Sequence, residues 1–243
     1  MPARLHQGHT ASYALADQER MANAKCYLAW LNRLIAPEIG RRVVEVGCGR
    51  GNFTEHLLDR EIVVALDIEP DCIARLNERF GPRPNLHTLV GDPEHPSFPD
   101  LARFQPDSCL CVNVLEHIEN DQEALARMAS ILKPGGVVVL FVPAFQALYG
   151  AVDRNLGHFR RYRHRDLQRL AEATGTRLKK SHYVNMPGFF GWWFHSHVLR
   201  SETVTESQIV VFDRYIAPVF AQIEKVVRPP FGQSLFAVFE KKR

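Results

Sequence analysis

Five short apolar runs alternate with segments of helical periodicity over residues 42–142. Helical patterns lie near residues 52–59, 71–80 and 120–132, and the apolar runs are RVVEVG, IVVALD, LHTLVG, SCLCVN and GVVVLFV. Strands that are apolar on both sides and that alternate with helices form a parallel sheet covered on both faces. The alternation therefore predicts an α/β fold built on a doubly wound, mostly parallel sheet.

Two further strands are predicted after this region. The segments RLKKSHYV and QSLFAVFEK are typical of strands, which brings the sheet to seven strands. The connection between them, residues 185–232, is too long for a hairpin turn. It carries a helical stripe from Ile209 to Val226, in which we expect Pro218 to cause a kink. We predict a helical insertion before the last strand.

The N-terminal region and the composition narrow the alternatives. Residues 11–36 have helical spacing up to Pro37, which predicts an N-terminal helical lead-in. No apolar stretch approaches the ~18 to 20 residues that a membrane span requires, so we expect a cytoplasmic protein. Five cysteines without a CxxC pair predict reduced, mostly buried thiols. A net charge of +3 is too small to indicate a nucleic-acid partner.

Three glycines, Gly47, Gly49 and Gly51, follow the first apolar run. In open parallel sheets a ligand lies beyond the C-terminal strand ends, where such a turn lets backbone N–H groups and a helix N-terminus approach it. Because Asn52 stands where the dinucleotide fingerprint GxGxxG needs its third glycine, a nicotinamide cofactor is disfavoured. Asp67 ends the second run, where it could accept hydrogen bonds from a ribose diol. The pattern predicts a nucleoside ligand.

Five motifs in this region also resemble those of the class I S-adenosylmethionine-dependent methyltransferases. In order they are VVEVGCGRGN, ALDIEPD, VGD, CVNVLEHI and LKPGG. The resemblance implies S-adenosylmethionine as the cofactor and methyl transfer as the reaction. It places the methionine part of the cofactor at the first motif, the ribose at the second and the adenine at the second and third. The implied cofactor-binding residues are Glu45, Gly47, Cys48, Gly49, Asn52, Asp67, Ile68, Gly91, Asp92, Asn113 and Val114.

The fourth motif raises the question of a metal. Some related O-methyltransferases similarly place Glu, Glu and His around a divalent cation, but Asn113 stands here in place of the first carboxylate. Glu116 and His117 alone are too few ligands for a divalent cation, so we expect no metal. We expect these two side chains to cap the loop and the next helix while they face the cofactor.

Residues 143–170 hold the candidate acceptor site, because the connection after the fifth strand reaches over the cofactor. Arg160 and Arg161 could bind a carboxylate or phosphate, although a solvated basic loop and a nucleic-acid contact are alternatives. Trp192 and Trp193 could line an apolar pocket, touch a membrane surface or simply belong to the core. The candidates for a catalytic base are His117, Asp153, His158 and Tyr162.

A second resemblance concerns the acceptor. The patterns LYG..D...GH.RRY and N.PG..GWW and the segment PFGQSL are similar to a bacterial subgroup often associated with polyprenyl-phosphate glycosyltransferases. This implies a small-molecule or lipid-linked, anionic acceptor, with no nucleic acid and with peripheral membrane contact as an option. Three alternatives stay open: a cyclase or lyase that uses the cofactor as its sole substrate, an RNA methyltransferase, and a non-catalytic cofactor-binding protein.

The expected organisation is one domain over residues 1–243. It comprises the lead-in at 1–40, a cofactor-binding half at 41–142 and a substrate half at 143–243. Within the substrate half, residues 185–232 would form a lid that excludes water from the reaction. The sequence leaves the oligomeric state open.

Overall fold

The computed structural model describes residues 21–199, 203 and 205–242 of the chain. One seven-stranded sheet has the order β3-β2-β1-β4-β5-β7-β6, and β7 alone runs antiparallel to its neighbours. The predicted seven-stranded, mostly parallel sheet is thus confirmed. The strands are β1 (Arg42–Val46), β2 (Ile62–Asp67), β3 (Leu86–Val90), β4 (Ser108–Val112), β5 (Val137–Pro143), β6 (Arg177–Val184) and β7 (Ser234–Glu240).

The strand order reverses between β1 and β4. The chain moves outward from β1 through β2 to β3, and then returns to place β4 on the other side of β1. The loops that follow β1 and β4 therefore leave in opposite directions, which opens a crevice at the C-terminal ends of these strands. This crevice is where a ligand is expected in such a sheet.

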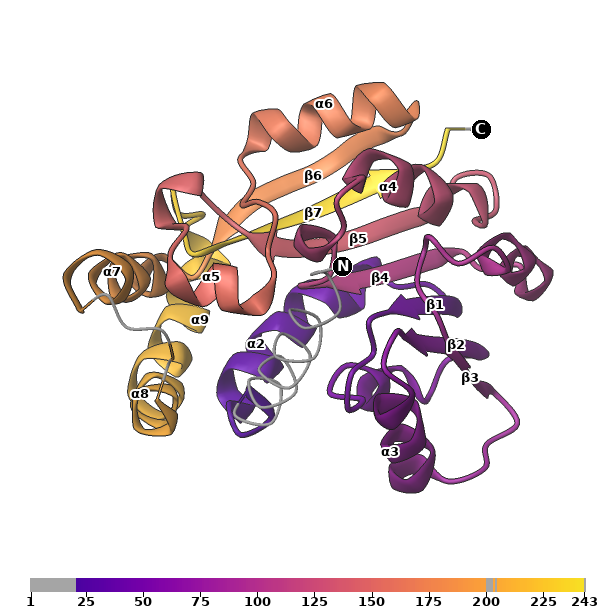
Figure 1. Ribbon diagram of the computed structural model, residues 1–243, viewed down its shortest axis with the longest axis horizontal. Coiled ribbons are helices and arrows are strands. Elements are labelled where there is room, and N and C mark those ends of the chain that lie inside the picture. The colour runs from indigo at the N-terminus through magenta and orange to yellow at the C-terminus, as the bar shows by residue number, and fades with distance from the viewer. Residues whose placement is uncertain (1–20, 200–202, 204, 243) are drawn as a thin grey trace, which may run out of the picture.

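Helices cover both faces of the sheet (Figure 1). One apolar cluster joins one face to α4 and α6, and a second cluster joins the other face to α2 and α9. This two-sided burial explains why the central strands carry almost no polar residues. The helices are α2 (Lys25–Ile35), α3 (Pro70–Phe80), α4 (Asp121–Ser130), α5 (Ala151–Leu156), α6 (His164–Thr174), α7 (Met186–Phe194), α8 (Glu206–Val211) and α9 (Ala217–Val226).

The N-terminal lead-in is confirmed for α2, whereas the part of that prediction before residue 21 lies outside the described residues. The buried positions Tyr27, Trp30 and Leu31 recur at three- and four-residue spacing, so one side of α2 packs on the sheet. The N-cap residue of α2, Ala24, offers no side-chain acceptor to the first backbone amides of the helix. Asp213 does so from the insertion, accepting hydrogen bonds from the backbone N–H groups of Cys26 (3.2 Å) and Tyr27 (2.8 Å).

The helix expected near residues 52–59 is a short 3₁₀ turn, Thr54–Leu57. Because β2 begins at Ile62, the chain has little room for a longer helix between the glycines and the second strand. The buried Thr54 hydroxyl donates a hydrogen bond of 2.6 Å to the Glu45 carboxylate, which fixes the turn against β1. The prediction that a helix N-terminus faces the ligand at this point is therefore wrong.

The insertion is helical as predicted, but the predicted apolar stripe does not form one continuous buried side of it. A π-helical turn, Phe212–Ile216, lies between α8 and α9, and Pro218 lies in the first turn of α9. The kink at Pro218 stays a prediction. A π turn contains more residues than an α turn, so it rotates the following residues to a different side. Ala217 and Ala221 of α9 are buried as a result, whereas Val219, Ile223 and Val226 at the end of the predicted stripe are exposed.

Two smaller predictions concern thiols and membranes. Cys48, Cys72, Cys109 and Cys111 are buried thiols, as expected, and Cys26 is an exposed one. Within the described part of the chain, no helix has the length and apolar character needed to cross a bilayer.

Candidate active site

One large cavity of about 1200 Å³ lies at the crevice between β1 and β4. Its walls include the turns after β1, β2 and β4 together with residues of α2, α7 and α8. Pockets for a single small ligand measure roughly 300 to 1000 Å³, so this cavity has room for two reactants side by side. The cofactor-binding and substrate halves both contribute to it, and their division at residue 142 stays a prediction.

The glycine turn after β1 forms one wall of the cavity. Gly47 and Gly51 have φ angles of 73° and 82°, in the left-handed region that glycine adopts most readily. A Cβ atom on Gly47 would lie 2.2 Å from Cγ2 of Val114, and one on Gly51 would lie 2.6 Å from the Phe80 ring. Neighbouring protein atoms therefore exclude side chains at these two positions.

The amides of the turn are used within the protein. The N–H groups of Gly47 and Cys48 donate to the carbonyl of Leu66, and that of Gly49 donates to Asp67 at 2.8 Å. The sequence interpretation, in which these N–H groups point to the ligand, is wrong for these three residues. What the turn offers a ligand is close approach to a backbone that is already held in place.

Asp67, at the end of β2, lies in the cavity wall and also braces the turn. Its carboxylate accepts hydrogen bonds from the amides of Gly49 and Glu69, one on each oxygen. Burial raises its pKa, although these backbone hydrogen bonds act in the opposite direction. Each oxygen keeps a second lone pair, so Asp67 can still accept hydrogen bonds from a diol.

Ten of the eleven predicted cofactor residues line the cavity. Glu45 does not: it is 3% exposed and lies beneath the turn, bound to the Thr54 hydroxyl. Burial raises the pKa of Glu45 to about 8, so this side chain is largely uncharged at neutral pH. The lining residues are Gly47, Cys48, Gly49, Asn52, Asp67, Ile68, Gly91, Asp92, Asn113 and Val114.

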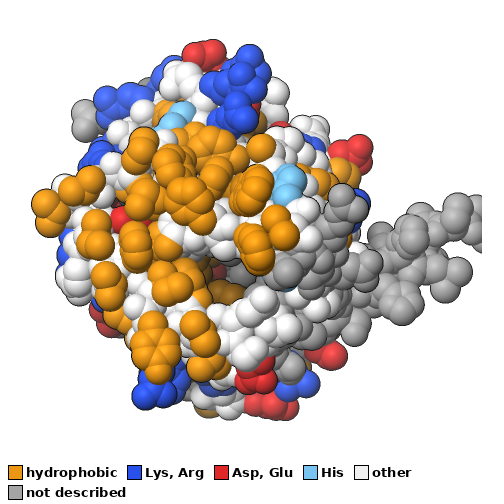
Figure 2. Space-filling view, turned by 90° about the vertical axis from the view of Figure 1, so that its left-hand side faces the viewer, with side chains coloured by type: hydrophobic (Ala, Val, Ile, Leu, Met, Phe, Trp, Pro, Cys, Tyr) orange, Lys and Arg blue, Asp and Glu red, His pale blue; other side chains and the backbone are white. Residues whose placement is uncertain are grey.

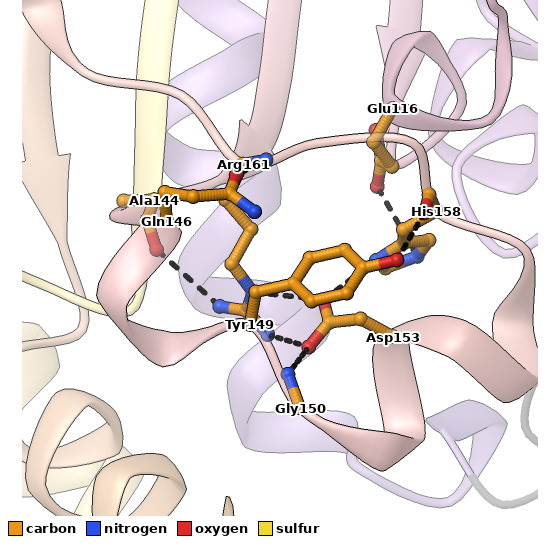
Figure 3. A network of polar contacts seen from close by, with 8 residues as sticks. All are labelled: Glu116, Ala144, Gln146, Tyr149, Gly150, Asp153, His158 and Arg161. Atoms are coloured by element: carbon orange, nitrogen blue, oxygen red, sulfur yellow. Dashed lines mark hydrogen bonds and ion pairs between the residues drawn. The ribbon is translucent and has the colours of Figure 1, made fainter.

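A hydrogen-bonded network on the loop after β5 reaches the opposite wall (Figure 3). His158 lines the cavity, and its Nδ1 lies 2.8 Å from Oδ1 of Asp153. Its carbonyl accepts a hydrogen bond of 2.6 Å from the Tyr149 hydroxyl, which fixes the backbone at this point. A carboxylate at Nδ1 holds the proton on that nitrogen and leaves the lone pair of Nε2 free to act as a base.

Arg161 keeps Asp153 ionised. Its guanidinium donates to both carboxylate oxygens, at 2.8 and 3.1 Å, and neither side chain is more than 1% exposed. Burial alone would raise the pKa of Asp153, but the hydrogen bond from His158 and the charge of Arg161 hold it below its usual value. The amide of Gly150 adds a further hydrogen bond of 2.9 Å to Oδ2. Asp153 itself does not line the cavity, so its effect on a ligand would act through His158.

Glu116 does not have the capping role that was predicted from the sequence. Its carboxylate is fully buried with no hydrogen-bond partner on either oxygen, so it caps nothing. The side chain of Asn120 caps α4 instead, accepting from the amide of Glu123. Oε1 of Glu116 lies 4.0 Å from Nε2 of His158, and burial raises the pKa of Glu116 to about 7. Only the folded arrangement reveals this carboxyl as unpartnered and next to the candidate base.

His117 completes a small cluster. Its ring packs edge-on against that of His158, with 4.6 Å between the ring centres. Burial, and then the charge of His158, lowers the pKa of His117 to about 4, which keeps it neutral. Ligand atoms of Glu116, His117 and His158 lie within 4.8 Å of one another, so this cluster is where a divalent cation could be held. The absence of a metal stays a prediction.

Two of the predicted residues have structural partners away from the cavity. The Tyr162 hydroxyl is buried and donates to Asp121 (3.0 Å) or to the carbonyl of Leu115 (3.3 Å). Burial raises the pKa of Tyr162 well above its usual value, so its hydroxyl stays protonated at neutral pH and no phenolate is available to take a proton. Arg160 pairs with Asp121 and donates to the carbonyl of Glu119. Neither Tyr162 nor Arg160 lines the cavity.

The two adjacent tryptophans lie on different sides of α7. Trp192 lines the cavity, and the guanidinium of Arg161 lies 4.8 Å from the centre of its ring. Trp193 is 47% exposed on the outer surface, where its ring stacks on His197. Of the four predicted substrate-binding residues, the structure thus brings Arg161 and Trp192 to the cavity and leaves Arg160 and Trp193 outside it.

Comparisons with known proteins agree with this architecture. A family model described as a methyltransferase domain matches residues 17–180. A chain of the complex between the Haloferax volcanii methyltransferase activator and a methyltransferase superposes with a TM-score of 0.65 at 17% identity, over 96% of this chain and 98% of that chain. A methyltransferase from Archaeoglobus fulgidus that depends on S-adenosylmethionine superposes with a TM-score of 0.56 at 23% identity, over 90% and 94% of the two chains. Both structures share the fold.

Curated relatives match a shorter region. An uncharacterised methyltransferase from Mycobacterium bovis is 28% identical over 131 residues, which cover 54% of this chain and 50% of the relative. The chain thus spans about half the length of the first curated relatives that it matches.

Proposed function

Because the chain belongs to the class I S-adenosylmethionine-dependent methyltransferases, we propose that it methylates a lipid-linked acceptor and that His158 takes the proton the acceptor loses. The observation that carries this proposal is the His158–Asp153–Arg161 network, which presents Nε2 of the imidazole to a cavity large enough for two reactants.

S-adenosylmethionine supplies a methyl group that is already activated by a positively charged sulfur. The residues of the first two strand ends fit an adenosyl group: the turn at Gly47 permits close approach, and Asp67 has lone pairs left for a ribose diol. Ile68 follows Asp67 in the cavity wall and is 63% exposed, which offers an apolar surface to a flat base. Asp92 and Asn113 line the same part of the cavity.

The role of His158 follows from its two ring nitrogens. Asp153 holds the proton on Nδ1, so the lone pair on Nε2 can accept a proton from an acceptor hydroxyl or amine as its new bond to the methyl carbon forms. The electrons of the broken carbon–sulfur bond stay on the sulfur, so no other group needs to be reduced or oxidised. Glu116, 4.0 Å from Nε2 and with a pKa of about 7, can share the proton that His158 gains.

The acceptor should have a substantial apolar part. Beyond the cofactor wall the cavity is bounded mainly by apolar side chains, among them Leu28 and Leu31 of α2, Trp192 of α7, and Ile209 and Phe212 of the insertion. Arg161 is the cation in this wall that could meet an anionic group, although Asp153 already engages it. An apolar chain with a polar head near His158 therefore suits the site better than a small, fully polar acceptor.

The test is to incubate the purified protein with S-adenosylmethionine and to identify the adenosyl product. S-adenosylhomocysteine should form when a lipid extract of the host is added, and not when the protein and the cofactor are alone. Methylthioadenosine without any extract would instead support a cyclase or lyase. Stimulation by RNA or by the water-soluble extract alone would contradict a lipid-linked acceptor, and no product under any condition would favour a non-catalytic binding protein.

A further inference from the structure

An apolar face covers the outer side of the insertion between β6 and β7. Phe190, Trp193 and Phe194 of α7 and Val219 and Ile223 of α9 are each 46 to 57% exposed. The two helices lie together, because Glu224 of α9 accepts hydrogen bonds from the amides that begin α7. Figure 2 shows hydrophobic side chains gathered on this side of the molecule, with charged side chains at its margin. Large contiguous apolar surfaces on soluble proteins mark interaction sites.

The charges of the insertion are arranged unequally around this face. Asp213 and Glu224 are turned inward, where both accept hydrogen bonds from backbone amides, whereas Glu206 is an exposed acid at the start of α8. Arg214, Lys225 and Arg228 are exposed, and none of the three forms an ion pair with another described residue. The face therefore has an apolar middle, and most of the exposed charges that the structure describes in the insertion are cations. This pattern suits a membrane surface with a hydrocarbon interior and anionic headgroups.

The face is also continuous with the cavity. Phe194 and Val211 line the cavity and are about half exposed on the outside, so the mouth is bordered by apolar side chains. A hollow is visible among the hydrophobic side chains in Figure 2. A hydrocarbon chain that enters beside Phe194 and Val211 would contact apolar side chains at that part of the mouth.

We propose that the face formed by α7, α8 and α9 rests on the surface of a lipid bilayer that carries anionic headgroups. Exposed aromatic side chains such as Trp193 and Phe190 are suited to the interface between headgroups and acyl chains, and the three cations are suited to the headgroups themselves. The bilayer contact does not depend on methyl transfer. The additional inference, that the acceptor enters the cavity from this surface, rests on the proposed function.

A second copy of the chain is the competing occupant. A two-fold pairing places the same surface of both copies face to face, so Arg214, Lys225 and Arg228 of one copy would meet a like-charged rim on the other. An anionic bilayer neutralises these cations instead. The charge pattern therefore favours the bilayer.

Vesicle flotation without S-adenosylmethionine tests the contact. The full chain should bind vesicles of phosphatidylcholine and phosphatidylglycerol in equal parts roughly tenfold or more tightly than vesicles of phosphatidylcholine alone. The variant Trp193→Ser/Ile223→Ser should lose most of this binding, and Arg214→Gln/Lys225→Gln should lose the preference for anionic lipid. Val90→Ser is the matched control, because Val90 is 51% exposed on β3, away from the insertion, and should bind as the unaltered chain does.

Tryptophan fluorescence provides a second measurement. Trp30 is buried and Trp192 lines the cavity, whereas Trp193 is exposed on the outer surface. Quenching by lipids brominated on their acyl chains should therefore fall in a Trp193→Phe variant that still floats with the vesicles, and a Trp192→Phe variant should keep most of it. Thermal unfolding near that of the unaltered chain would show that each variant is folded.

Three results would overturn the proposal. These are no binding to either kind of vesicle, equal binding by the Trp193→Ser/Ile223→Ser variant, and a dimer in gel filtration that this variant converts to a monomer. Because the flotation assay contains no cofactor, its outcome is separate from that of the methyl-transfer assay. If the chain floats with the vesicles but forms no S-adenosylhomocysteine, the proposed function is refuted and the proposed bilayer contact is supported.

Discussion

His158 has a fixed proton on one side and an unsatisfied carboxyl on the other. Asp153 binds its Nδ1, while Glu116 faces its Nε2 without any other partner. A base held in this way is oriented before the acceptor arrives, which is the condition under which proton transfer contributes most to the rate. This arrangement makes the role of His158 testable by a single substitution.

Replacing His158 with Gln should lower kcat by roughly 10²- to 10⁴-fold if the acceptor must lose a proton. The affinity for S-adenosylmethionine should stay within about twofold, because the cofactor residues lie on the other wall. Steady-state kinetics and titration calorimetry measure the two quantities. The control is His56→Gln, an exposed histidine in the 3₁₀ turn. Unchanged kcat in the His158 variant would show that this imidazole is not the base.

Asp67 should determine cofactor affinity. The variant Asp67→Ala removes the lone pairs offered to the ribose and also releases the amides of Gly49 and Glu69. We expect S-adenosylhomocysteine to bind at least ~10-fold more weakly in calorimetry, since two hydrogen bonds to a charged group each contribute about 1.5 to 3 kcal/mol. Asp71→Ala is the control, because Asp71 is an exposed acid on the next helix. Equal affinity in both variants would exclude the ribose role.

Residue patterns predicted the cofactor wall better than the acceptor wall. The strand ends dictate where Gly47, Asp67 and Asn113 lie, because side chains at the C-terminal ends of parallel strands meet at one edge. The loop after β5 obeys no such rule. Arg160, Arg161 and Tyr162 are adjacent in the chain, yet Arg161 alone of the three reaches the cavity, because the partners Asp121 and Asp153 draw the side chains apart.

At the scale of elements, the turn after β1 is held by packing as well as by its backbone conformation. Gly47→Ala should lower the free energy of unfolding by about 2 to 4 kcal/mol, from the left-handed φ and from the contact with Val114. Cofactor binding should be lost, because the turn must move to relieve the contact. Urea unfolding and calorimetry measure the two effects.

Two further variants separate the causes of that effect. Gly175 has a similar φ of 67°, but a Cβ atom added there would meet open space. Gly175→Ala should therefore lower the free energy of unfolding by only about 1 kcal/mol and keep full cofactor affinity. Adding Val114→Ala to Gly47→Ala removes the clashing methyl and should recover part of the affinity. If the double variant binds no better than Gly47→Ala, the contact with Val114 is not what excludes a side chain at this position.

The insertion is joined to α2 by a cap that no local pattern in the sequence predicts. Asp213 lies 186 residues from Tyr27 in the chain and still binds the first amides of α2. Asp213→Ala should lower the free energy of unfolding by about 1 kcal/mol and increase hydrogen exchange at Cys26 and Tyr27. Glu206→Ala, at the exposed start of α8, is the control. Unchanged exchange in α2 would contradict the capping role.

Strands were predicted more accurately than helices, for a physical reason. A buried parallel strand is identified by its apolar run alone, and β2 has the bounds of the predicted run IVVALD. The side of a helix depends on every preceding turn being regular. The π turn at Phe212–Ile216 breaks this condition, which is why the predicted stripe fails after it and why the exposed face of α9 could not be predicted from spacing.

At the scale of the whole molecule, buried acids and buried histidines oppose each other in the dependence of stability on pH. Burial raises the pKa of Glu45 from 4.5 to about 8 and that of Glu116 to about 7. Burial lowers the pKa of His117 and His182 from 6.5 to about 4. Both shifts disfavour the charged form inside the protein, but they act on proton binding with opposite signs.

Stability falls with rising pH where the folded state binds more protons than the unfolded state, and it rises where the folded state binds fewer. Between pH 4.5 and the raised values, the two carboxyls bind more protons in the folded state, so stability falls as the pH rises. Between about pH 4 and 6.5 the two histidines bind fewer protons in the folded state, so stability rises with pH and offsets the carboxyls. Above pH 6.5 the histidines are neutral in both states, and the raised carboxyl pKa values dominate the slope.

The cofactor-free protein should therefore lose stability between pH 6.5 and 8, by on the order of 1 kcal/mol per pH unit from Glu45 alone. Glu45→Gln keeps the acceptor for the Thr54 hydroxyl but cannot ionise, so this variant should have a flatter slope and exceed the unaltered chain in stability at pH 8. Urea unfolding at the two pH values measures both, with Glu78→Gln on the exposed side of α3 as the control. If Glu45→Gln keeps the full slope, the carboxyl beneath the glycine turn is not its source. Glu116→Gln then tests the other carboxyl whose pKa burial raises to about 7.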